Sequence, residues 1–144
     1  MSDAIVQAVL RWIGTPYQHQ QSQYGVGTDC LGLIRGLWRE VIGPEPEVVP
    51  SYLRDWGETG AEEILQLATM RHLIAKSLAE PDLGDVILFR MRRGCIAKHL
   101  GVQVQIGAAP SFVHAYSGHC VTESPLSQAW ARKIVARFQF PLER

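Results

Sequence analysis

The sequence predicts a single α+β domain in which helices from the first part of the chain pack on a small antiparallel β-sheet from the second part. Two patterns support this prediction. Apolar residues before Pro81 recur at the three- and four-residue spacing of amphipathic helices. After Pro81 the chain changes to short runs of β type. The 144 residues fit one domain covering residues 1–144, and they contain no internal repeat.

The first predicted helix contains Ile5, Val9 and Trp12, which form one apolar stripe at helical spacing. Gly14-Thr15-Pro16 then ends the element. Residues 16–29 are rich in Gln, Gly, Tyr and Thr and follow neither the helical nor the strand period. This segment is expected to be an ordered loop that leads to the second helix.

The second predicted helix begins at Cys30. Cys30, Ile34 and Leu37 share one helical face, and Gly43-Pro44 stops the run. Further along the chain, a capping-box pattern predicts a third helix over about residues 59–70.

Five runs of β type follow Pro81. They are Val86–Met91, Ala97–Ile106, Ser111–Tyr116, a weaker run near Cys120, and Ile134–Phe140. Alternation in the second run places Leu100 and Val102 on an apolar face and His99 on a polar face. In the third run, His114 shares a face with Phe112. The two histidines are therefore expected on neighbouring hairpin strands.

Composition and charge argue against several classes of protein. A hydrophobic content of 47% and a charged content of 19%, without a long apolar run, disfavour disorder and membrane insertion. Lys plus Arg equals Asp plus Glu at 14 each, so no overall positive charge favours nucleic acid. Arg90, Arg92 and Arg93 form the densest basic cluster, which we interpret as a solvated edge.

Cys30 is the candidate nucleophile. A thiol reacts as its thiolate, and the first turn of a helix favours negative charge because its N–H groups are unpaired. Cys30 is therefore expected to be held as an anion. The alternative is a buried cysteine that only starts the apolar face of the helix. Cys30, Cys95 and Cys120 are an odd number of cysteines and specify no disulfide framework.

His99 and His114 are the candidates for a base and for the group that orients it. A nucleophilic cysteine requires an imidazole within hydrogen-bonding reach and a third polar group behind that imidazole. A single histidine on a strand is usually structural. Two histidines on neighbouring strands, opposite a cysteine that begins a helix, form a catalytic constellation.

A zinc site is the alternative to a catalytic role for the two histidines. The residues of metal-ligand type are Cys95, His99, His114, His119 and Cys120. Their spacings match no compact zinc motif, so no metal or organic cofactor is expected. Structural roles are preferred for Cys95 and Cys120.

Five short motifs follow one another along the chain. They are Gly14-Thr15-Pro16-Tyr17, Asp29-Cys30-Leu31-Gly32-Leu33, Gly84-Asp85-Val86, Lys98-His99-Leu100-Gly101-Val102 and Phe112-Val113-His114-Ala115. Each alone is weakly specific, but together, in this order and spacing, they resemble the NlpC/P60 family of cysteine peptidases. The resemblance implies a papain-like NlpC/P60 fold. It also implies hydrolysis of peptidoglycan stem peptides, typically between D-glutamate and a diamino acid.

The resemblance also implies roles for individual residues. By position, Cys30 is the nucleophile, His99 the general base and acid, and His114 the group that orients His99. The hydroxyl of Tyr17 joins the Cys30 N–H in stabilising the oxyanion, with simple packing on the first helix as the alternative. Asp29 is a helix N-cap, a ligand of the substrate amine, or both.

Two departures from the family pattern concern substrate placement. Leu31 stands where the family usually has Ser, and the Gln-rich segment Gln18–Gln23 replaces a Trp-Gly-Gly stretch. Together with Pro50-Ser51-Tyr52 and Asp55-Trp56, the Leu31 pattern resembles the branch of the family found in phage tails and gene transfer agents.

This branch implies a wall hydrolase that a particle carries to the periplasm or cell wall. The first residues lack the pattern of a secretory signal peptide, so synthesis in the cytoplasm is expected. The expected partners are peptidoglycan stem peptides and the baseplate proteins of such a particle. One alternative is a non-catalytic baseplate or adaptor module on the same fold. Another is acyl transfer or amide hydrolysis on a different substrate.

Overall fold

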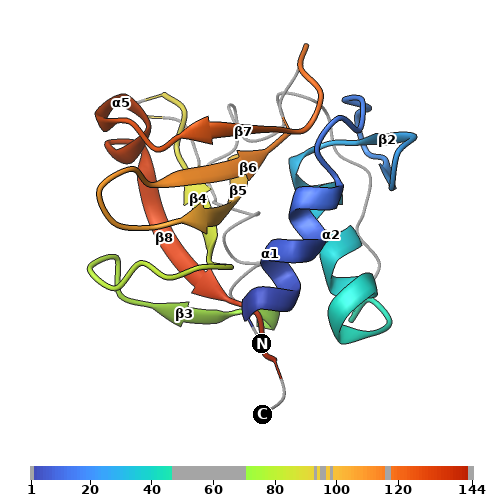
Figure 1. The fold of residues 1–144 in the computed structure, drawn as a ribbon, viewed down its shortest axis with the longest axis horizontal. Helices are drawn as coiled ribbons and strands as arrows, with labels where there is room; N and C mark the ends of the chain where they lie inside the picture. The colour runs from blue at the N-terminus through green and yellow to red at the C-terminus, as the bar shows by residue number, and fades with distance from the viewer. Residues whose placement is uncertain are drawn as a thin grey trace.

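The computed structural model describes residues 2–46, 71–92, 94, 97, 99–115 and 118–142. In Figure 1 two helices stand beside a six-stranded antiparallel sheet, which confirms the predicted α+β fold. Within the described residues, no helix is long and apolar enough to cross a membrane. The helix predicted at 59–70 and the residues from Pro50 to Trp56 lie outside the described part of the chain.

Helix α1 (Ser2–Arg11) forms where the apolar stripe predicts it. Ile5, Val9 and Trp12 are each at most 2% exposed, so the stripe faces the core. After the helix, the Gly14 N–H donates a hydrogen bond to Val121 O, and the Val121 N–H donates one to Thr15 O, both at 2.9 Å. The end of α1 is therefore tied to a distant segment of the chain.

Helix α2 (Cys30–Leu37) begins at Cys30, as predicted, and continues as a π-helical turn, η1 (Trp38–Ile42). The run ends at Gly43, whose φ of 151° is a conformation that other residues rarely adopt. Close contact between α1 and α2 depends on Gly36. A Cβ atom at Gly36 would lie 2.3 Å from Cζ2 of Trp12, so only glycine lets that indole ring approach α2.

The segment between the two helices forms a short hairpin of β1 (Ser22–Gln23) and β2 (Gly27–Thr28). Tyr17 also pairs with Thr28 through an isolated bridge. The segment is thus ordered, as predicted, but it contains strand pairing that its composition does not indicate.

The six-stranded sheet has the order β3-β8-β4-β5-β6-β7, and all its neighbours are antiparallel. Its strands are β3 (Ile74–Lys76), β4 (Val86–Phe89), β5 (His99–Gln105), β6 (Ser111–His114), β7 (Thr122–Pro125) and β8 (Ile134–Gln139). Four predicted runs contain β4, β5, β6 and β8. Strand β7 follows the weak run predicted near Cys120, and β3 was not predicted.

Two hydrophobic clusters cover the two faces of the sheet. The main core joins α1 and α2 to residues such as Leu100, Val102 and Val113. A smaller cluster on the other face contains Ile87, Phe89 and Phe112, with Trp130 from the short helix α5 (Gln128–Ala131) packed against it. In Figure 1, α5 lies on the other side of the sheet from α1 and α2.

Candidate active site

Asp29 determines where α2 begins. Its Oδ1 accepts a hydrogen bond from the Gly32 N–H and its Oδ2 accepts one from the Gln20 N–H, both at 2.8 Å. The residue is 3% exposed and is the N-cap of the helix. Both carboxylate oxygens are thus engaged with backbone groups. Capping, one of the roles considered for Asp29, is what the structure shows, and it places Cys30 as the first residue of α2.

Gly32 allows the preceding loop to lie directly against the first turn of α2. A Cβ atom at this position would lie 1.9 Å from the carbonyl oxygen of Gln21. That carbonyl accepts a hydrogen bond from the Asp29 N–H at 3.2 Å. The Ser22 hydroxyl donates to the Gly32 carbonyl at 2.6 Å. The glycine of the second sequence motif therefore has a packing role next to the candidate nucleophile.

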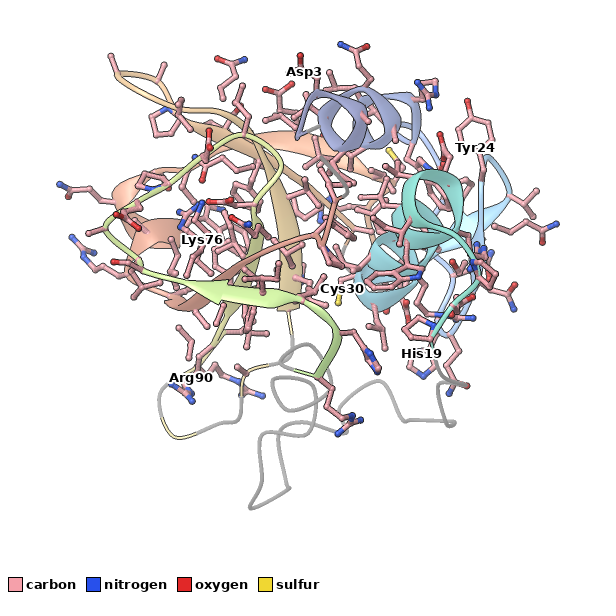
Figure 2. All side chains as sticks on the ribbon, turned by 90° about the horizontal axis from the view of Figure 1, so that it is seen from below. Asp3, His19, Tyr24, Cys30, Lys76 and Arg90 are labelled. Atoms are coloured by element: carbon pink, nitrogen blue, oxygen red, sulfur yellow. The ribbon has the colours of Figure 1, made fainter. Side chains whose placement is uncertain are left out.

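Cys30 lies where α2 meets strand β5. It is half-buried and packs against the main core. Its sulfur receives a hydrogen bond from the backbone at Leu100, the residue after His99. Figure 2 shows Cys30 between α2 and the sheet. The helix start and the beginning of β5 are thus brought together, as the catalytic hypothesis requires.

Burial and a neighbouring carboxylate raise the pKa of the Cys30 thiol to about 12. Burial is the larger cause because it disfavours the charged thiolate, and Asp29 adds electrostatic repulsion. Hydrogen bonds from the backbone at Leu100, Leu31 and Cys30 lower the pKa but do not outweigh these effects. The expectation that Cys30 is held as an anion is therefore wrong for the resting site. Cys30 is a neutral thiol near pH 7 and needs a base for activation.

His99 and His114 are hydrogen-bonded to each other. Nε2 of His99 lies 2.9 Å from Nδ1 of His114. The register of β5 and β6 pairs Gly101 with His114, which places His99 diagonally across from His114 on the same face. The prediction that the two histidines lie on neighbouring strands is confirmed. One ring nitrogen of each histidine is used in this contact.

The face that carries the two histidines is buried, and its expected polar character is wrong. His99 is 6% exposed and His114 is 0% exposed. The ring centroid of Trp130 lies 5.7 Å from that of His99 and 5.1 Å from that of His114. The ring centroid of Phe89 lies 5.7 Å from that of His99, and the ring centroid of Phe112 lies 4.3 Å from that of His114. Alternation identifies residues that share a face but not the aromatic rings that cover it, and Trp130 was missed.

Burial lowers the pKa of His114 to about 4, with a further contribution from the nearby His119. Desolvation is the first cause because it disfavours the imidazolium form. His114 is therefore neutral near pH 7. A neutral imidazole carries one proton, so it can donate through one nitrogen and accept through the other.

Acid is expected to destabilise the fold through His114. The pKa of this group is about 4 in the folded protein and 6.5 as its ordinary value, so between these values only the unfolded chain takes up a proton. The contribution of His114 to stability is complete above 6.5 and is lost as the pH falls to about 4, by about 3 kcal/mol in total. Urea denaturation across this range should show the loss in the wild type and not in His114→Gln. Parallel pH dependences of the two proteins would contradict the expectation.

Solved protein structures resemble this chain along nearly its whole length, although no family model and no curated protein matches it. An NlpC/P60 family protein from Bacillus cereus has a TM-score of 0.68 and 17% identity over 97% of this chain. The NlpC/P60 domain of the peptidoglycan hydrolase SagA has a TM-score of 0.64 and 19% identity over 97% of this chain. The chain has the NlpC/P60 fold.

The chain spans different shares of these solved structures. The chain spans 99% of the SagA domain but only 40% of the Bacillus cereus protein. It spans 42% of a lipoprotein-like NLP/P60 family protein from Staphylococcus aureus, with a TM-score of 0.62 and 18% identity. Ly7917, solved with the hydrolyzing product of MDP, has a TM-score of 0.60 and 11% identity, and this chain spans 63% of it. At such identities the likeness establishes the fold.

Tyr17 is held beside the segment that enters α2 in this NlpC/P60 fold. The Thr28 N–H donates to Pro16 O at 3.0 Å, and the Gln18 N–H donates to Thr28 O at 3.1 Å. These bonds fix the backbone of Tyr17 next to Thr28, two residues before Cys30. The half-buried Tyr17 ring packs against the main core. Its oxyanion role stays a prediction.

The two departures from the family pattern lie close to Cys30. Leu31 is half-buried and packs against the main core. In the Gln-rich segment, the Gln20 N–H is bound by Asp29, and His19 lies 4.0 Å from the same carboxylate. The segment that replaces Trp-Gly-Gly is thus anchored to the helix cap.

Among the residues that the structure describes, no group of three or more His, Cys, Asp or Glu side chains is placed to hold a metal ion. Cys120 is an exposed free thiol and His119 is exposed. Cys95 lies outside the described part of the chain. The described ligand-type residues therefore do not form the zinc site considered as the alternative.

Proposed function

We propose that this protein is a cell-wall hydrolase, a cysteine endopeptidase that cleaves the stem peptides of peptidoglycan. One observation carries the proposal. The Cys30 sulfur accepts a hydrogen bond from the backbone of Leu100, directly after His99, and His99 is hydrogen-bonded to His114. A thiol, an imidazole and a second imidazole that orients the first are the parts required for nucleophilic attack on a carbonyl.

The proposed reaction begins at His99. Because Nε2 of this ring is engaged with His114, Nδ1 takes the proton of the Cys30 thiol. The thiolate adds to the amide carbonyl, and the Cys30 N–H and the Tyr17 hydroxyl stabilise the oxyanion. His99 then gives its proton to the leaving amine as the C–N bond breaks. Water, activated by His99, hydrolyses the thioester and restores the thiol.

The high pKa of the Cys30 thiol indicates the order of these steps. A thiol with a pKa of about 12 is neutral near pH 7, so the resting site is a thiol beside an imidazole. Proton transfer to His99 then accompanies attack on the substrate. No thiolate–imidazolium ion pair exists before the substrate binds, so the entry of a neutral peptide group does not disrupt such a pair.

The substrate proposal rests on the family motifs and on the structural relatives. The SagA domain belongs to a peptidoglycan hydrolase, and Ly7917 was solved with the hydrolyzing product of MDP. The bond that we propose joins D-glutamate to the diamino acid of the stem peptide. We further propose that residues 1–144 act as one domain on a phage tail or gene transfer agent particle, with baseplate proteins as partners. Leu31 and the motifs at Pro50-Ser51-Tyr52 and Asp55-Trp56 support this part.

Mass spectrometry of digested peptidoglycan tests the proposal. Wild-type protein should release fragments with a new amino group on the diamino acid. Cys30→Ala should release none, because the variant lacks the thiol that forms the proposed thioester. Cys120→Ala is the matched control, since it removes an exposed free thiol and should leave the products unchanged. Full cleavage by Cys30→Ala would exclude the mechanism. Fragments that are cut at another bond would contradict the proposed bond specificity and leave the cysteine mechanism in place.

A further inference from the structure

His114 has a second hydrogen-bond partner on the side away from His99. Its Nδ1 is 2.9 Å from Nε2 of His99, and its Nε2 is 2.8 Å from Oγ of Ser124. Ser124 lies on β7, where it pairs in register with Phe112 of β6. Three adjacent strands, β5, β6 and β7, thus contribute one side chain each. The hydrogen bonds therefore run from His99 through His114 to the hydroxyl group of Ser124.

The action of His99 as a base determines the direction of these hydrogen bonds. An imidazolium carries a proton on both ring nitrogens, so the Nε2–H of His99 requires an acceptor. Nδ1 of His114 can accept only if the single proton of that ring is on Nε2. The other tautomer would place two N–H groups against each other across 2.9 Å just when the positive charge forms.

We propose that Ser124 is a positioning residue that holds His114 in the tautomer protonated at Nε2 by accepting a hydrogen bond from that N–H. The inference rests on the proposed function, in which His99 is the base. Ser124 acts through His114 and does not touch the reacting atoms.

Burial makes this hydroxyl group important. The His114 side chain is 0% exposed, so a lost partner is not readily replaced by water. Burial and His119 keep the pKa of His114 at about 4, so the ring holds one proton near pH 7. Ser124 is half-buried and also lines an open surface groove with Pro110 and Leu126. Its own O–H can therefore be donated outward to solvent while its oxygen accepts from His114.

Nitrogen NMR of the imidazole rings tests the tautomer without an assay of activity. Long-range nitrogen–proton spectra of histidine-labelled protein near neutral pH should show His114 protonated at Nε2 in the wild type. Ser124→Ala should convert this signal to a mixture of the two tautomers. Ser124→Thr keeps the hydroxyl and should retain the wild-type form. A wild-type His114 protonated at Nδ1, or an unchanged spectrum in Ser124→Ala, would overturn the proposal.

Kinetics of peptide cleavage provide a second readout. In Ser124→Ala the imidazolium of His99 loses its ordered acceptor, so kcat should fall about tenfold while KM changes less than about twofold. The acid limb of the pH profile of kcat/KM should move to lower pH, because His99 becomes a weaker base. Ser124→Thr should restore both values. A reduced kcat with an unmoved acid limb would indicate a purely structural role and would overturn the proposal.

Ser111→Ala is the matched control. It makes the same change of side chain on the neighbouring strand, where the Ser111 hydroxyl donates to Glu123 at 2.6 Å. The His114 tautomer and the acid limb should stay as in the wild type. Failure of the proposed function is distinguishable from failure of this inference. Wild-type protein that cleaves no peptidoglycan removes the function, while the spectra still decide whether Ser124 sets the tautomer.

Discussion

Replacing His99 by alanine is expected to slow cleavage of peptidoglycan peptides by about 10²- to 10⁴-fold. With a pKa of about 12, roughly one Cys30 thiol in 10⁵ is ionised at about pH 7, so attack depends on a base. We propose His99 as this base because it is hydrogen-bonded to His114 and because Cys30 contacts the backbone of Leu100, the next residue. The rate of release of new amino groups from purified peptidoglycan measures the effect.

The pH dependence of the variant distinguishes a missing base from a damaged fold. In His99→Ala, hydroxide has to remove the proton of Cys30, so the logarithm of the rate should rise with pH at a slope of about one. The wild-type rate should level off once His99 is neutral. His72→Ala removes an imidazole that lies edge-on to Trp38 and should keep the wild-type rate and profile. A wild-type rate in His99→Ala would exclude His99 as the base.

Replacing Asp85 by alanine is expected to lower the free energy of unfolding by about 3–5 kcal/mol. Asp85 is 1% exposed and accepts hydrogen bonds from Lys76 Nζ at 3.0 Å and from Arg137 at 2.9 Å. Its Oδ2 also accepts one from the Asp82 N–H at 2.8 Å. Loss of the carboxylate leaves two cations in a poorly solvated region, one of them the 3% exposed Arg137. Urea denaturation near neutral pH measures the change.

Two further variants sharpen the Asp85 experiment. Asp85→Asn keeps the shape of the side chain and an acceptor for Asp82, so its loss of stability should be smaller than that of Asp85→Ala. Asp82→Ala removes an exposed carboxylate and should cost less than about 1 kcal/mol. Equal stabilities of Asp85→Ala and Asp82→Ala would show that the buried ion pairs contribute little.

The ion pairs of Asp85 also indicate what one of the five sequence motifs does in the fold. Lys76 is on β3, Arg137 on β8, and Asp85 directly precedes β4, so the ion pairs join three adjacent strands. Strand β4 in turn pairs with β5, with Phe89 opposite His99. Gly84-Asp85-Val86 therefore supports the strand that carries the candidate base.

Local patterns in the sequence predict those elements whose stability comes from an apolar face. The stripe of Ile5, Val9 and Trp12 predicts α1, and the run that begins at Cys30 predicts α2. Alternation likewise predicts β5 and β6 and the shared face of His99 and His114. In each case the periodic residues are the ones that the fold buries.

Elements without an apolar pattern could not be predicted in the same way. Strand β7 consists of Thr122, Glu123, Ser124 and Pro125, and it is held by pairing with β6 and not by apolar burial. Strand β3 has three residues, and its Ile74 is 48% exposed. Helix α5 spans four residues, too few for a helical period. Two of these elements, β7 and α5, carry Ser124 and Trp130, the contacts of His114 that the sequence did not reveal.

Periodicity and order along the chain are enough to predict which residues could do chemistry, namely a cysteine at a helix start and two histidines on adjacent strands. The protonation of these residues depends on the fold. The pKa of Cys30 rises and that of His114 falls mainly because other segments of the chain bury the two side chains. The adjacent Asp29 adds to the shift of Cys30, but desolvation, the larger cause, depends on packing in space, which no spacing along the chain encodes.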